Sequence, residues 1–284
     1  MGNQYSLAHL TVIGCSPPEM TYIAARAGYD FVSFRFIPMG VPGEFAYLPS
    51  DKEMIRKTKA ALADTGLKML DLELAKIAAD RDPKDYLPAM EIAAEMGARH
   101  VISSAWTDVR TDRDFIIERY GEICDLAKQF GLTVDMEFPT FSRLTNLQEA
   151  VDIVQAADRE NGGIFIDTLY FHLSRVTLDG LEALPRKWIH FMHIADTGPE
   201  IPTTREDMIH LVRDDRLYVG EGCIDFKAVL GRLPKVPYSI ELPNVKRVQE
   251  YGYEEHARHC LETARQAIDT PAETPAREYA MSVN

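Results

Sequence analysis

Four ionisable side chains stand at the ends of successive apolar segments in the second half of the chain. They are Glu137, Asp167, His193 and Glu241. Three carboxylates and one imidazole make a hard, oxygen-rich set of ligands, which favours Mn²⁺, Mg²⁺ or Co²⁺ over a histidine-rich zinc site. Buried carboxylates are unfavourable unless they are paired or bind a metal. If these side chains converge, one divalent cation is the simplest way to offset their repulsion.

Short apolar segments alternate with longer amphipathic segments along the whole chain. The pattern predicts strands at residues 5–13, 30–36, 67–74, 99–105, 132–138, 163–168, 188–195 and 237–242. Helical patterns fall between them, and one closes the chain near residues 253–268. Eight strands that alternate with eight helices are typical of an α/β fold, the (β/α)₈ TIM barrel, whose active site lies at the carboxyl ends of the strands.

Strand alternation predicts which side chains enter the barrel, because successive residues of a strand face opposite sides. In the fifth to eighth predicted strands, apolar residues alternate with the four ionisable residues, which therefore face inward. In the third, Leu70, Leu72 and Leu74 are expected outside, with Asp71 and Glu73 inside.

Two further residues are placed by the same alternation. His190, three residues before His193, is expected to face outward. Arg35 in the second strand faces inward. It is either a structural ion pair with Glu73 or Asp71, or a clamp on a substrate oxyanion.

These segments together resemble the xylose-isomerase-like barrels of the sugar phosphate isomerase/epimerase superfamily. The likeness rests on Asp135-Met136-Glu137-Phe138, Phe165-Ile166-Asp167-Thr168, His193-Ile194-Ala195-Asp196, Gly220-Glu221-Gly222-Cys223-Ile224-Asp225 and Ser239-Ile240-Glu241, with His9-Leu10-Thr11 and Arg35 similar to one branch. It spans nearly the whole barrel in the same order. The resemblance implies that Glu137, Asp167, His193 and Glu241 bind one divalent metal, Mn²⁺ first, with Mg²⁺ or Co²⁺ as alternatives.

The resemblance also suggests which residues bind substrate. Arg216 lies where the family often has a substrate-binding arginine, and Arg35 would act with it. His9 and Trp106 are expected to form pocket walls. The family often has a histidine three residues after the sixth-strand aspartate. This chain has Tyr170 there, with His172 two residues further on.

The predicted metal site suits reactions of a polyhydroxylated carbonyl compound, either a sugar or a sugar-like molecule. A divalent cation can chelate adjacent carbonyl and hydroxyl oxygens and stabilise the enediolate formed on proton removal. Glu137 and Glu241 are the candidate proton carriers. Reprotonation of the enediolate would make the protein an isomerase or epimerase, the activities most frequent in the family. Loss of a β-hydroxyl gives the alternative, a lyase of the inosose or dehydroshikimate dehydratase type.

Composition disfavours other classes of function. The 284 residues include 31 Lys+Arg and 44 Asp+Glu, a formal charge of −13, which opposes binding to nucleic acid or an anionic membrane. An apurinic-endonuclease-type phosphodiesterase needs a basic face and a larger, more histidine-rich metal cluster. A non-catalytic barrel is disfavoured by the complete ligand set. The four cysteines are far apart, which suggests reduced thiols in a cytoplasmic protein.

No internal stretch resembles a domain linker. We therefore expect one barrel over residues 1–269 and a tail over 270–284 that is disordered or packs on a partner subunit, since homodimers are common in the family. Segments 37–50 and 197–220 are longer than a barrel connection requires. Both follow strands, so they are expected to act as lids.

Overall fold

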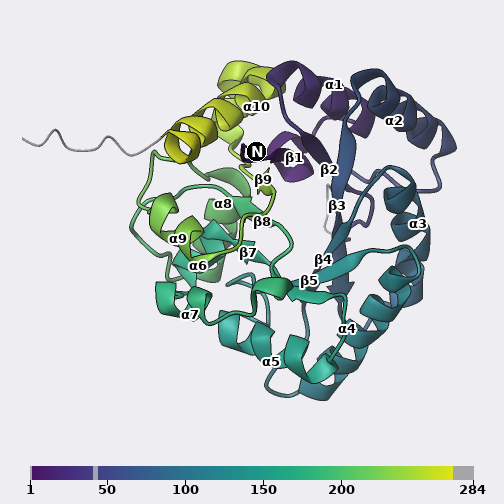
Figure 1. Ribbon diagram of the computed structural model, residues 1–284, viewed down its shortest axis with the longest axis vertical. Coiled ribbons are helices and arrows are strands. Elements are labelled where there is room, and N and C mark those ends of the chain that lie inside the picture. The colour runs from purple at the N-terminus through teal and green to yellow at the C-terminus, as the bar shows by residue number, and fades with distance from the viewer. Residues whose placement is uncertain (1, 41–43, 271–284) are drawn as a thin grey trace, which may run out of the picture.

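The computed structural model describes residues 2–40 and 44–270 and shows parallel strands enclosed by a ring of helices (Figure 1). The strands are β1 Tyr5–Ala8, β2 Phe31–Arg35, β3 Lys68–Ile77, β4 His100–Ala105, β5 Thr133–Glu137, β6 Gly162–Ile164, β7 Ile166–Asp167, β8 Met192–Ile194 and β9 Tyr238–Ile240. Their order is β6-β5-β4-β3-β2-β1-β9-β8-β7, with every neighbouring pair parallel. The predicted α/β barrel is confirmed.

Helices follow most of the strands and pack around the barrel, and one of them, α8, lies over its mouth. They are α1 Pro17–Ala27, α2 Lys52–Thr65, α3 Leu87–Glu95, α4 Arg113–Lys128, α5 Leu147–Ala157, α6 Thr168–Leu173, α7 Leu178–Glu182, α8 Arg205–Asp214, α9 Phe226–Arg232 and α10 Val245–Asp269, with 3₁₀ helices η1 His9–Val12, η2 Pro83–Tyr86 and η3 Arg186–Trp188. Helix α10 contains a kink at Gly252, where φ is 76°. The predicted closing helix, 253–268, corresponds to the part after this kink.

The predicted sixth strand is divided at Phe165. Its first part, β6, pairs with β5, and its second part, β7, pairs with β8. The Phe165 amide still donates to the carbonyl of Met136, at 2.9 Å. One segment of chain therefore bridges the two edges of the sheet, which brings the barrel close to closure and explains why nine strands replace eight.

The first strand is shorter than predicted. Strand β1 ends at Ala8, and His9–Val12 form the 3₁₀ helix η1. The Thr11 hydroxyl donates to the carbonyl of Ile240 and accepts from the amide of Leu242. These bonds join the turn to the end of β9, so strand alternation does not describe residues 9–13.

Strand β3 contains two irregularities that alter the predicted facing of its leucines. Between Met69 and Leu72, β3 has one residue more than the segment of β2 with which it pairs. It has one extra residue again between Leu72 and Ala75, where it pairs with β4. Each bulge restarts the alternation. Leu70 and Leu74 consequently pack inside the barrel, and the prediction that they face outward is wrong. Leu72 does pack in the outer core, as predicted.

The barrel interior has its own apolar layer below the mouth. Its buried members are Met39, Leu70, Leu74, Ile102, Phe165 and Phe191. The rings of Phe165 and Phe191 lie 4.8 Å apart, and Phe165 also contacts His193 edge-on at 4.7 Å. This layer supports the imidazole from below.

The strand predicted at 188–195 begins only at Met192, and this changes the position of His190. Residues 186–188 form η3, so the chain reaches β8 through irregular backbone. His190 turns to the side chain of Asp135 inside the amino end of the barrel, with Nδ1 2.6 Å from Oδ1. The predicted outward orientation of His190 is wrong, because the assumed alternation does not extend to it.

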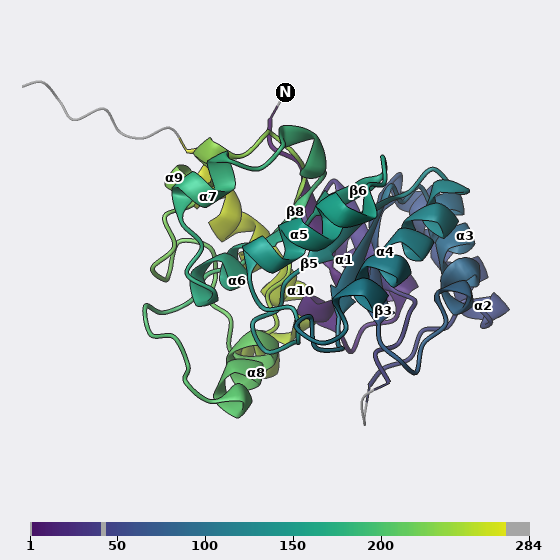
Figure 2. The same cartoon turned by 90° about the horizontal axis from the view of Figure 1, so that it is seen from below.

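The two long segments differ in structure. Within 37–50, residues 41–43 lie outside the described part of the chain, and the described remainder contains no helix or strand. Segment 197–220 contains α8, which Figure 2 shows at the opposite edge of the molecule from α9. Of the predicted tail, residues 271–284 lie outside the described residues. Within the described ranges, no helix has the length and apolar character needed to cross a membrane.

Replacing Phe165 by Ala tests the inner apolar layer. Phe165 is fully buried, so loss of its ring should lower the free energy of unfolding by about 3–5 kcal/mol. The matched control is Phe45→Ala, because Phe45 is 52% exposed and its loss should change stability by less than about 0.5 kcal/mol. Urea denaturation followed by circular dichroism measures both. Equal effects of the two substitutions would show that the inner layer does not stabilise the barrel.

Candidate metal centre

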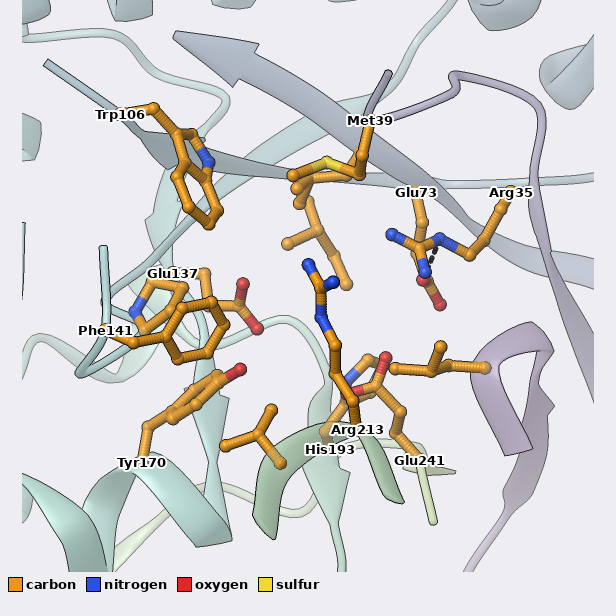
Figure 3. Close-up of a pocket in the computed structure, with 15 residues that line it drawn as sticks. Arg35, Met39, Glu73, Trp106, Glu137, Phe141, Tyr170, His193, Arg213 and Glu241 are labelled. Atoms are coloured by element: carbon orange, nitrogen blue, oxygen red, sulfur yellow. Dashed lines mark ion pairs between the residues drawn. The ribbon is translucent and has the colours of Figure 1, made fainter. Parts of the chain in front are cut away.

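The barrel brings the four predicted ligands together at the carboxyl ends of its strands. Glu137 ends β5, Asp167 ends β7, His193 lies in β8, and Glu241 directly follows β9. Potential ligand atoms of Glu137, Asp167 and His193 all lie within 4.8 Å of one another. His193 Nδ1 is 3.4 Å from Glu241 Oε2. Figure 3 shows Glu137, His193 and Glu241 around one pocket.

The hydrogen-bonding state of His193 fits a metal ligand. Both ring nitrogens are buried without a well-formed hydrogen bond in the described part of the chain, and Nδ1 has only its ion-pair contact with Glu241. Burying an imidazole whose hydrogen bonds are unmade is costly, and a cation between it and the nearby carboxylates would remove that cost. The chemistry and proximity of these four side chains therefore fit one divalent cation.

Arg216 lies beneath this cluster rather than in the pocket wall. Its guanidinium is fully buried, 2.9 Å from Asp167 Oδ2 and 2.8 Å from Glu241 Oε2. It also donates to the backbone carbonyls of Val212 and Glu241. A carboxylate has about four lone-pair sites, so these contacts leave both acids able to bind a cation. In the described structure Arg216 therefore holds ligand carboxylates in place and does not reach the pocket.

The charges of the cluster shift its pKa values in opposite directions. Burial, together with Glu241 and Asp167, raises the pKa of Glu137 well above its usual range. Burial opposes protonation of His193, yet the negative charges of Glu241, Glu73 and Asp167 raise its pKa to about 10. For Glu241 the effect of burial is outweighed by His193 and Arg216, which hold its pKa below the usual range.

Two more carboxyl groups, Asp71 and Glu73, project from β3 into the same interior. Potential ligand atoms of both lie within 4.8 Å of those of His193. Burial is the main reason why the pKa of Asp71 rises to about 7 and that of Glu73 to about 8. Ser33 donates a hydrogen bond to Asp71, and Arg35 forms an ion pair with Glu73 at 3.4 Å. The ion-pair alternative for Arg35 is therefore realised, although Arg35 also faces the pocket.

The pocket above the cluster has a cavity of about 60 Å³. Its walls include Arg35, Trp106 and Tyr170, three of the residues predicted to bind substrate.

Arg213 is a pocket residue that the sequence reasoning missed. Figure 3 shows its side chain pointing from α8 into the middle of the pocket. It lies three positions before Arg216, the arginine expected to bind substrate. The helical pattern of 205–214 was the available signal, because a helix that covers the mouth must direct one face toward it.

Two predicted substrate contacts lie away from the pocket walls. The His9 ring is buried under η1, where Nδ1 accepts from the amide of Arg35 and Nε2 therefore donates to the carbonyl of Cys15. Burial lowers the pKa of His9 to about 4, so the ring is neutral. His172 is near Cys223, with Nδ1 3.8 Å from Sγ. Neither imidazole lines the cavity.

Asp196 fixes the base of the long segment that carries α8. Its carboxylate accepts hydrogen bonds from the backbone amides of Thr197, Gly220, Gly222 and Ile224 at 2.8–3.1 Å. A side chain at residue 222 would overlap this carboxylate, which explains the glycine there. The two ends of the segment are therefore joined.

A parallel barrel with a carboxylate-rich cluster at the carboxyl ends of β5, β7, β8 and β9 defines a class of TIM barrels suited to binding a divalent cation. The chain belongs to the xylose isomerase-like TIM barrel family, whose model matches residues 22–264.

Curated relatives and solved structures agree with this membership. An inosose isomerase of Bacillus licheniformis is 27% identical over 205 residues, 69% of each protein. A 3-dehydroshikimate dehydratase of Pseudomonas aeruginosa is 24% identical over 257 residues, 85% of this chain but 38% of that enzyme. The crystal structure of an IolI protein with a bound zinc atom superposes with a TM-score of 0.75 at 20% identity, covering 95% of this chain and all of the other.

Metal binding at this cluster should release protons. In the metal-free protein His193, with a pKa near 10, is protonated at pH 7, and the raised pKa of Glu137 favours its protonated form. A cation that binds to them must displace these protons, so we expect about one to two protons released per Mn²⁺ and an affinity that rises with pH from 6 to 8. Calorimetric titration in two buffers of different ionisation enthalpy measures the number. His193→Gln should reduce it by about one. A binding enthalpy independent of the buffer would contradict this arrangement.

Proposed function

We propose that the protein is a divalent-metal-dependent isomerase or epimerase of a polyhydroxylated carbonyl compound, a sugar or sugar-like molecule. The observation that carries the proposal is the convergence of Glu137, Asp167, His193 and Glu241 around a buried imidazole that makes no well-formed hydrogen bond. The inosose isomerase relative supports this class of reaction. Mn²⁺ is the expected ion, with Mg²⁺ or Co²⁺ as alternatives, because carboxylate oxygens dominate the ligand set.

When bound, the cation would supply Lewis acidity, which polarises the substrate carbonyl and favours loss of the neighbouring proton. The protein must then remove this proton and return one. Glu137 and Glu241 stand on separate strands at the pocket, so each can face a different side of the substrate carbon. Either can serve as base, because a carboxylate within hydrogen-bond reach of the proton suffices.

Other pocket residues would bind and orient the substrate. Arg213 and Arg35 present guanidinium groups toward the cavity, suited to hydroxyl or carbonyl oxygens. Trp106 and Phe141 provide an aromatic wall, with ring centroids 5.8 Å apart. Because Arg213 lies on the helix that covers the mouth, its movement with α8 would widen the cavity and then exclude water after binding.

A dehydratase is the second candidate, and Tyr170 is the observation that favours it. This residue takes the position of the histidine expected for a sugar isomerase, and it lines the pocket. Burial, followed by the charge of Glu137, raises its pKa well above the usual range, so its hydroxyl stays protonated. A protonated phenol can donate to a departing hydroxyl group. The dehydroshikimate dehydratase relative is consistent with that chemistry.

Solvent exchange distinguishes these proposals. Inososes, ketohexoses and 3-dehydroshikimate should be tested as substrates in D₂O with excess Mn²⁺ and followed by NMR and mass spectrometry. An isomerase or epimerase exchanges the α-hydrogen and gives a product of unchanged composition, whereas a lyase releases water. A compound that binds at the pocket in a crystal yet shows neither exchange nor turnover would argue for a non-catalytic barrel.

Replacing either glutamate by Gln tests its role in proton transfer. Gln keeps an oxygen and the shape but removes the basic carboxylate. We expect modestly weaker Mn²⁺ binding and about 10²–10⁴-fold lower activity at saturating metal. The variant that lacks the base should also lose α-hydrogen exchange, while the other should retain exchange but form little product. The matched control is Glu221→Gln, since that carboxylate pairs with Arg247 away from the pocket. If both pocket variants keep near-normal rates with excess metal, these glutamates are ligands only.

A further inference from the structure

A second cluster of metal-ligating side chains lies at the amino ends of the strands, opposite the proposed active site. It consists of His100, the first residue of β4, Asp135 in β5, and His190, shortly before β8. One potential ligand atom from each lies within 4.8 Å of the other two. This second cluster plays no part in the function proposed above.

An aromatic layer separates the second cluster from the first. Phe191 stacks on His100 with ring centroids 4.9 Å apart, and its edge-on contact with His193 is at 6.3 Å. Phe165 packs beside Phe191 in the same layer. The two clusters therefore occupy different ends of the barrel interior, and ligands of one do not reach the other.

The hydrogen bonds around Thr133 determine which nitrogen of His100 can bind a cation. The Thr133 hydroxyl donates its single proton to Asp135 Oδ2, at 3.2 Å. His100 Nδ1, at 2.8 Å from the same oxygen, must therefore be the N–H donor, and Nε2 carries the lone pair. An imidazole held by a hydrogen bond at one nitrogen and open at the other is the usual state of a histidine ligand.

The cluster packs against Gly163 in β6, a position where only glycine leaves enough space for its side chains. A Cβ atom there would overlap Asp135 Oδ1 and lie 2.8 Å from His190 Cε1. The backbone of β6 at Gly163 therefore lies close to the side chains of Asp135 and His190, and the absence of a Cβ atom leaves space for both. Access from solvent is through His190, whose side chain is 20% exposed, while Asp135 is fully buried.

We propose that His100, Asp135 and His190 form a second cation site, specific for a zinc-like divalent ion. Two imidazoles and one carboxylate match the donors of zinc and cobalt sites, in contrast to the carboxylate-rich cluster at the mouth. His190 Nδ1 is 2.6 Å from Asp135 Oδ1. Tetrahedral bonds of about 2.0–2.1 Å would widen this separation to roughly 3.3 Å, a small rotation of the exposed imidazole. The ion would join β4, β5 and the segment before β8.

The alternative is a plain ion pair between protonated His190 and Asp135, and it predicts no bound metal. Zinc and cobalt titrations of chelator-stripped protein distinguish the two. They should be done in a His193→Gln background, which weakens the mouth cluster. The readout is the Zn²⁺ binding that substitutions in the second cluster remove, so the result does not depend on the proposed function. We expect this variant to bind about one Zn²⁺ per chain, to show the visible absorption of tetrahedral cobalt with Co²⁺, and to gain thermal stability with Zn²⁺.

Adding His190→Gln should weaken this binding by more than about 100-fold and remove the cobalt bands and the thermal shift. Asp135→Asn, likewise added, is a second test if His190→Gln is poorly folded by circular dichroism. The matched control is His210→Gln, because His210 pairs with Asp214 at 3.1 Å on the surface, and it should leave binding unchanged. The proposal is overturned if the His193→Gln variant binds no Zn²⁺, or if it binds equally well after His190→Gln and Asp135→Asn.

Discussion

The concentration of carboxyl groups inside the barrel is the constraint on which the rest of the site depends. Glu137, Asp167, Glu241, Asp71 and Glu73 are all buried near one imidazole. Isolated charges at such depth are strongly unfavourable, so each must be paired, protonated or bound to a cation. Arg216 and Arg35 supply two fixed positive charges, fewer than the five acids require. The shortfall is the physical reason why a divalent cation suits this site and why several of these groups hold protons without one.

Arg216 shows how far this constraint determines structure. An arginine is rarely fully buried unless its charge is paired, and here two carboxylates and two backbone carbonyls surround it. Removing it would leave buried carboxylates uncompensated, which is more costly than losing an exposed ion pair. The Asn244 side chain also donates to the Arg216 carbonyl, which connects the arginine to the start of α10. Asp167 and Glu241 are thus held in place by Arg216, in the segment that directly follows α8.

The sequence predicted the barrel and the four converging residues because both depend on regular patterns. Alternation along β5, β8 and β9 and the order of the short motifs are local properties of the chain. Predictions failed where the backbone departs from regularity. The bulges of β3 turned Leu70 and Leu74 inward, and the irregular approach to β8 directed His190 to Asp135. Arg213 was not named from the sequence for another reason: the fold of a long connection decides which of two nearby arginines enters the pocket.

The four amide hydrogen bonds to Asp196 have a consequence for how this barrel can diversify. They join the two ends of the long segment that contains α8 to each other and to the end of β8. A loop with joined ends tolerates changes in length, since loop-closure entropy grows only slowly with the number of residues. Insertions or exchanges between Gly198 and Asp215 can therefore reshape the roof of the pocket while the carboxylate cluster at its floor keeps its geometry. Because of Asp196, the shape of the pocket roof can change independently of the positions of the carboxylates at its floor.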